Sequence, residues 1–92
     1  MTEETLACQL TVRGHVQGVF FRDRVRREAA HRGVAGWAAN RPDGTVEVVL
    51  EGASEPVKQV IDYCHRGPRG ATVTDVEVRT IEPRGLSGFQ IR

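Results

Sequence analysis

The 92-residue chain lacks most features that mark a metal site, a disulfide scaffold or a membrane protein. Its 2 cysteines and 3 histidines show no metal-ligand spacing and no C-x-x-C pair. No stretch approaches the roughly 18 apolar residues of a membrane span. The first residues have neither the basic region nor the apolar core of a signal peptide. We therefore expect a cytoplasmic protein with no bound metal, in which residues 1–5 form a flexible leader.

Aromatic residues and net charge are also scarce. The chain has 1 Trp, 1 Tyr and 3 Phe, a formal net charge of +1, and no K/R-G-F/Y-G/A-F-V-x-F/Y pattern. RNA-recognition domains stack bases on sheet aromatics and carry a basic surface. The composition therefore disfavours nucleic-acid binding, and nothing in it recruits an anionic membrane. Five arginines do fall within one predicted helical segment, and we expect most of them to be solvated: Arg22, Arg24, Arg26, Arg27 and Arg32.

Side-chain groups for acid, base or nucleophilic catalysis are missing as well. No serine or threonine lies in a nucleophile elbow. Asp23 and Glu28 form no evident acid–base pair. Any reaction here must therefore be accelerated by positioning and electrostatics.

Hydrophobic periodicity predicts a single domain over residues 6–92. We predict a first strand over 6–13 and a helix over 21–32 that Gly33 ends. Strands 34–40 and 45–51 follow, joined by the turn 41–44. A second helix is capped by Ser54 and ends at 66–70, and strand 74–78 and a short closing strand 89–92 complete the chain. The order β-α-β-β-α-β predicts a two-layer α/β sandwich of the ferredoxin-like, split βαβ type. In this α+β fold, two helices cover one face of an antiparallel sheet.

The two cysteines fall on predicted buried faces. Cys8 alternates with apolar residues of the first strand, and Cys64 shares a helical stripe with Val57, Val60 and Ile61. Both are typical of core thiols in a reducing compartment. A disulfide between them stays open as an alternative, because both elements would pack in one core.

The segment between the first strand and first helix contains the main candidate site. Gly14 and Gly18 allow positive φ and close approach of a ligand. Backbone N–H groups of this turn can form a nest, the helix adds its positive end, and Arg22 adds a planar fork of donors. This combination suits a phosphate. The simpler interpretation is a plain strand-to-helix turn, with Arg22 paired to a carboxylate or to the chain terminus.

Asn40 is a second candidate, at the end of a predicted strand. Its carboxamide either stabilises the following bend or orients a water molecule. Trp37 has the opposite parity on this strand, which favours packing against the sheet.

Two segments carry a resemblance to a known family. The first is Gly14-His15-Val16-Gln17-Gly18-Val19-Phe20-Phe21-Arg22, which resembles the acylphosphatase signature G-x-V-Q-G-V-x-[FY]-R. The second is Gly36-Trp37-Ala38-Ala39-Asn40, followed by Gly44-Thr45-Val46 and Gly52. The ending Gly88-Phe89-Gln90-Ile91-Arg92 is also typical of the family, and the similarity extends over about residues 6–92.

The resemblance implies an enzyme that hydrolyses the carboxyl–phosphate anhydride of a small acyl phosphate without metal or organic cofactor. It implies that Arg22 holds the phosphoryl group and Asn40 positions the attacking water. The backbone of His15, Val16, Gln17, Gly18, Val19 and Phe20 would complete the phosphate site. Many members carry a threonine where this chain has Val25, which bears on the rate. We expect a monomer; the alternative is a non-catalytic module that binds phosphate or carbamoyl phosphate.

Overall fold

A computed structural model describes residues 4–92 of the chain. The elements in chain order are β1 (Thr5–His15), α1 (Phe21–His31), β2 (Ala35–Asn40), β3 (Val46–Ala53), α2 (Ser54–Arg66), β4 (Thr72–Thr80) and β5 (Phe89–Ile91). This is the predicted β-α-β-β-α-β order with a closing strand. β1 begins at Thr5, within the predicted leader, and residues 1–3 of that leader lie outside the described residues.

The five strands form one sheet in the order β4-β1-β3-β2-β5. β1 pairs antiparallel with β3 and β4, and β2 pairs antiparallel with β3. β5 pairs parallel with β2, so the prediction of an antiparallel sheet is wrong for this strand. The physical reason is the connection after β4, which crosses from one edge of the sheet to the other and reverses the chain direction.

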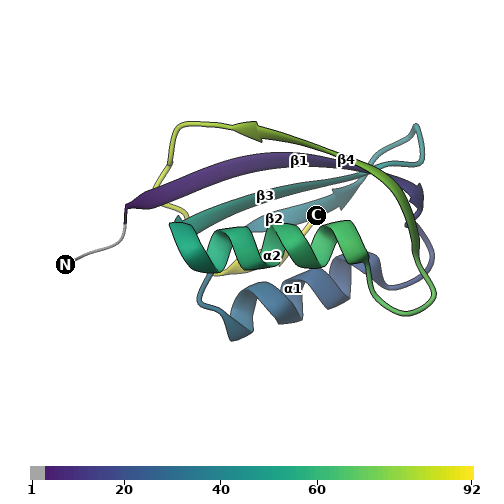
Figure 1. Ribbon diagram of the computed structural model, residues 1–92, viewed down its shortest axis with the longest axis horizontal. Coiled ribbons are helices and arrows are strands. Elements are labelled where there is room, and N and C mark those ends of the chain that lie inside the picture. Colours follow the sequence, from purple (N-terminus) through teal and green to yellow (C-terminus); the bar gives the residue numbers. More distant parts are fainter. Residues whose placement is uncertain (1–3) are drawn as a thin grey trace.

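The core lies between the sheet and the two helices, which cover the same face in Figure 1. Alternate residues of β1 and β3 point into it, as in the pair Leu10 and Val48, because side chains of a strand alternate between its faces. Helix α1 contributes Phe21, Val25 and Ala29, and helix α2 contributes Val57, Val60 and Cys64. The predicted apolar patterns of these four elements are therefore confirmed.

The opposite face of the sheet carries polar contacts. The Arg92 guanidinium lies over the Trp37 ring, 4.6 Å from its centroid. Glu51 on β3 is only 7% exposed, and its carboxylate accepts hydrogen bonds from the backbone of Arg84, Gly85 and Leu86 at 2.7–3.0 Å. Glu51 thus fixes the connection between β4 and β5 to the centre of the sheet.

Helix α2 does not begin as predicted. Ser54 is its first helical residue, Ala53 is the N-cap, and no side chain among residues 4–92 caps the helix. The N–H of Ser54 donates instead to the Glu4 carbonyl oxygen at 3.1 Å. Because β1 starts beside the end of β3, its backbone satisfies this donor without a hydroxyl.

Both cysteines are free and buried, so the disulfide alternative does not apply. Burial raises the pKa of the Cys64 thiol to about 12 and also raises the pKa of Cys8. Since the thiolate is the reactive form, we expect neither thiol to react with Ellman's reagent in the native protein. Full unfolding should release two reactive thiols. Rapid modification of the native protein would contradict the buried positions.

Candidate active site

The loop from Val16 to Phe20 connects β1 with α1, and the two glycines predicted for this segment, Gly14 and Gly18, have different roles. Gly14 belongs to β1, where a Cβ atom would lie 2.0 Å from the Thr72 carbonyl oxygen. Gly14 is therefore required for the close approach of β1 and β4. Gly18 has φ 75°, and nothing lies within 4 Å of where its Cβ would be. It serves the backbone conformation and leaves the loop open on that side.

Buried side chains hold this loop at both ends. Val16 and Phe21 are each 1% exposed, and Val19 packs against the core between them. Phe20 is the N-cap residue of α1, with φ 61° and ψ 24°, and no side chain in the described part of the chain caps the helix. This left-handed conformation costs a non-glycine residue about 1–2 kcal/mol. The packing of its neighbours therefore imposes the conformation on Phe20.

The loop presents a run of unpaired donors. Within residues 4–92, no backbone N–H of the segment 16–20 donates a hydrogen bond to another protein group. The first N–H groups of α1 follow directly and have no partner within the helix. Successive free amides beside a positive helix end are a typical anion site. His15, also predicted for this set, is the exposed last residue of β1, in register with Thr72 of β4.

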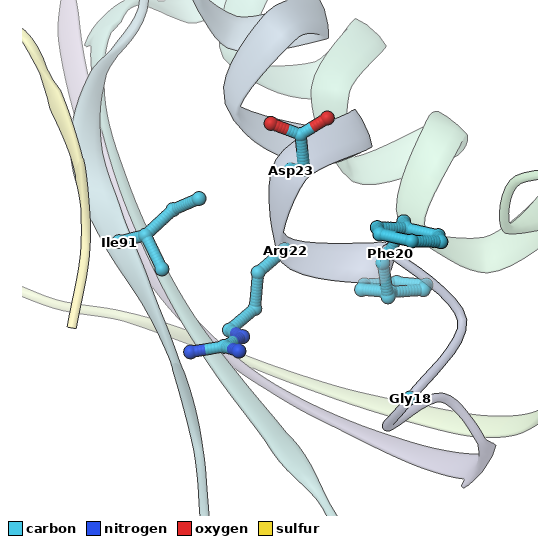
Figure 2. Close-up of a pocket in the computed structure, with 6 residues that line it drawn as sticks. Gly18, Phe20, Arg22, Asp23 and Ile91 are labelled. Carbon is cyan, nitrogen blue, oxygen red and sulfur yellow. The ribbon is translucent and has the colours of Figure 1, made fainter.

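Beside the loop is a hollow of about 360 Å³, lined by Gly18, Phe20, Phe21, Arg22, Asp23 and Ile91. Figure 2 shows the Arg22 side chain extending from the start of α1, between Ile91 and the turn at Gly18. The structure thus places Arg22 beside Gly18 and Phe20 of the loop.

Arg22 keeps most of its donors free. Its Nη1 donates to the backbone oxygen of Arg92 at 3.1 Å, and among the described residues it forms no ion pair with a carboxylate. The nearby Asp23 carboxylate is paired with Arg26 at 2.6 Å and with Arg27 at 3.2 Å. Its charge is therefore balanced within α1, and it does not pair with Arg22. The contact of Arg22 with Arg92, the last residue of the sequence, matches the simpler interpretation of Arg22, while its other donors are left for the hollow.

Gln17 joins the loop to the β2–β3 turn. Its side-chain Nε2 donates to the backbone oxygens of Arg41 at 2.8 Å and Thr45 at 2.9 Å. The turn is itself fixed, because Asp43 accepts hydrogen bonds from the Thr45 hydroxyl and N–H, which lower the pKa of Asp43. The sequence predicted a role only for the backbone of Gln17. Its place in the motif was the available signal for a role of the side chain, but the side-chain partners, Arg41 and Thr45, are remote in sequence.

Asn40 lies at the end of β2, exposed and outside the lining of the hollow. It shares the parity of Ala38, so it projects from the helix-covered face. Two links bring the other site residues to this end of the strand. Gln17 bonds to Arg41, the next residue, and Arg22 bonds to Arg92, whose N–H donates to Ala38 at 2.8 Å. These links bring the loop and Arg22 toward the end of β2 that carries Asn40.

The described part of the chain has neither a metal-ligand cluster nor a membrane-spanning helix. Residues 4–92 contain no group of three or more His, Cys, Asp or Glu placed to hold a metal ion. No helix among them is long and apolar enough to cross a membrane.

The fold and site define a two-layer α+β domain with a loop of free amides beside an arginine. A family model described as Acylphosphatase matches residues 8–91. An acylphosphatase of Thermococcus kodakarensis is 52% identical over 82 residues, covering 89% of this chain and 90% of that protein. One from Haloquadratum walsbyi is 46% identical over 92 residues, covering 100% and 99%. The crystal structure of acylphosphatase from Bacillus subtilis superposes with a TM-score of 0.91 at 36% identity, covering 95% of this chain and 98% of that one.

The chain therefore belongs to the acylphosphatase family. The predictions of this family, of its ferredoxin-like two-layer fold and of a hydrolytic enzyme are confirmed.

Proposed function

We propose that Arg22 and the N–H groups of residues 16–20 hold the phosphoryl group of a small acyl phosphate, while Asn40 orients the attacking water. The observation that carries the proposal is the run of unpaired N–H groups beside a guanidinium with free donors. Together they would surround a tetrahedral anion with positive partial charge. The site residues match the family signature position by position.

This arrangement suits phosphoryl transfer from a good leaving group. The transition state is loose and spreads charge over the equatorial phosphoryl oxygens. Preorganised N–H donors and Arg22 stabilise that charge, and the fork of Arg22 can bind two oxygens at once. Asn40 contributes orientation of the water, which lowers the entropic part of the barrier. We propose that the bound phosphoryl group accepts the proton of this water, because the carboxylate in the lining, Asp23, is paired with Arg26 and Arg27.

Turnover separates this proposal from the alternative of a non-catalytic phosphate- or carbamoyl-phosphate-binding module. We expect the purified protein to convert benzoyl phosphate to benzoate and inorganic phosphate, with phenyl phosphate as an ester control that stays intact. We also expect activity to survive treatment with EDTA. Saturable phosphate binding without hydrolysis of any acyl phosphate would favour the alternative.

We further propose that the protein works as a cytoplasmic monomer, with a small molecule as its substrate and no nucleic-acid or membrane partner. The near-neutral net charge of +1 supports this proposal. Light scattering after size-exclusion chromatography should give the 10.2 kDa mass of one chain. A dimer mass at micromolar concentration would contradict the monomer.

Replacing Gln17 with alanine should weaken the site without removing a proposed ligand of the phosphate. The loop would lose both hydrogen bonds to the β2–β3 turn. The position of the loop amides relative to Asn40 would then no longer be fixed. We expect kcat/KM for benzoyl phosphate to fall about 10-fold, since small misplacements of catalytic groups cost up to about 10²-fold. Gln9→Ala, a glutamine on the opposite face of the sheet, is the matched control. Equal kinetics of the two variants would remove Gln17 from this role.

Val25, which stands where many members have threonine, is fully buried in the core. In this chain the position contributes apolar packing between α1 and the sheet. A Val25→Thr variant would bury a hydroxyl at that place, so its stability has to be measured alongside its rate.

A further inference from the structure

Exposed apolar side chains gather at the candidate active site. Three large hydrophobic residues are more than a third exposed in the described part of the chain: Phe20 at 77%, Val78 at 41% and Ile91 at 38%. Phe20 and Ile91 both line the hollow that contains Arg22. Val78 lies on β4, at the opposite edge of the sheet from β5.

The ring of Phe20 does not serve the core. Phe21, the next residue, is 1% exposed and packs inside, whereas Phe20 lies outside at the mouth of the hollow. The family signature places no requirement on this position, which is its second x. In Figure 2, Arg22 extends from the start of α1. Ile91 lies on one side of it, and Phe20 and the turn at Gly18 lie on the other.

The hollow is also larger than a phosphate needs. Its volume of about 360 Å³ falls within the range of small-molecule sites, which is about 300–1,000 Å³. Arg22 and the loop amides take the charged end of a ligand. Asp23 is balanced by Arg26 and Arg27, so it adds no unpaired negative charge. The remaining lining that can touch a ligand is dominated by the side chains of Phe20 and Ile91.

We infer that Phe20 and Ile91 form a subsite for the acyl group, and that this chain prefers acyl phosphates with an aromatic or branched aliphatic acyl group over small ones. The inference rests on the proposed function and names its substrate class. With the phosphoryl group on Arg22, the acyl group extends toward these two side chains and removes apolar surface from water. An acetyl group is too small to cover both.

The test compares kcat/KM for benzoyl phosphate with kcat/KM for acetyl phosphate. The variants are Phe20→Asn, which tolerates the left-handed conformation, and Ile91→Thr, which keeps a branched residue in β5. We expect the ratio of kcat/KM for benzoyl phosphate to kcat/KM for acetyl phosphate to fall about 10-fold from wild type to Phe20→Asn. This is near the lower end of what one methylene-sized apolar contact contributes. The fall in Ile91→Thr should be smaller. Val78→Thr, at an apolar residue that is 41% exposed and away from the hollow, should keep the wild-type ratio.

The outcomes separate this inference from the proposed function. Equal losses for both substrates in Phe20→Asn, or a wild-type ratio near one, would overturn the acyl subsite while leaving acyl phosphate hydrolysis intact. A wild-type protein that hydrolyses neither substrate would overturn the proposed function itself. Circular dichroism of each variant confirms that the fold is retained before the ratios are compared.

Discussion

Arg22→Lys is expected to lower kcat/KM for benzoyl phosphate by at least about 100-fold, the scale for losing one key electrostatic donor. Lysine keeps the positive charge but loses the planar fork that can bind two phosphoryl oxygens. It also loses the geometry of the contact between Arg22 and the Arg92 backbone oxygen, which holds the guanidinium beside β2. Steady-state kinetics and the inhibition constant for inorganic phosphate measure both losses, and we expect phosphate to inhibit more weakly.

Arg24→Lys is the matched control, because Arg24 is an exposed arginine on the same helix that does not line the hollow. Its kinetics should equal those of the wild type. If Arg22→Lys were to behave like Arg24→Lys, the phosphate would bind elsewhere and Arg22 would have no place in the mechanism. A melting curve for each variant separates a loss of chemistry from a loss of structure.

Asn40→Ala is expected to lower kcat about 100-fold while leaving inhibition by inorganic phosphate nearly unchanged. The reason is that Asn40 is proposed to hold the water and not the anion. Its position supports this division, because Asn40 lies at the end of β2 and outside the lining of the hollow that contains Arg22. Asn40→Gln should also lose most of the rate, since an added methylene displaces the carboxamide.

Gln90→Ala serves as the control for Asn40, because Gln90 is an exposed carboxamide on the neighbouring strand β5, opposite Trp37. It should retain wild-type kcat. Loss of phosphate inhibition in a folded Asn40→Ala protein would show that the side chain contacts the anion, contrary to the proposed role.

Much of the fold could be predicted from periodicity, because each element shows one apolar face to a single core. Alternation in β1 and β3 and the stripe through Val57, Val60 and Cys64 were sufficient. The parallel pairing of β5 was not predictable from its three residues, since it depends on where the preceding connection crosses the sheet. Glu51 holds that connection through partners more than 30 residues away. Ser54 was misassigned for the same reason, because the backbone of Glu4 satisfies its N–H.

The candidate site was predictable to the extent that the motif is continuous in sequence. Arg22 lines one hollow with Gly18 and Phe20 of the loop, because one strand, one loop and one helix start suffice to place them. The side-chain bonds of Gln17 join this loop to a distant hairpin, and no local pattern indicates them. The different roles of Gly14 and Gly18 likewise depend on the pairing of β4 with β1, because only Gly14 lies against the backbone of β4.

Titration of the ¹⁵N-labelled protein with inorganic phosphate, followed by amide chemical shifts at constant ionic strength, examines the anion site itself. We expect saturable shifts that are largest for the N–H groups of residues 16–20 and for the Arg22 side chain. The dissociation constant should agree with the inhibition constant for hydrolysis. Shifts centred on the opposite face near Trp37, or none at inhibitory concentrations, would contradict an oxyanion site built from this loop and Arg22.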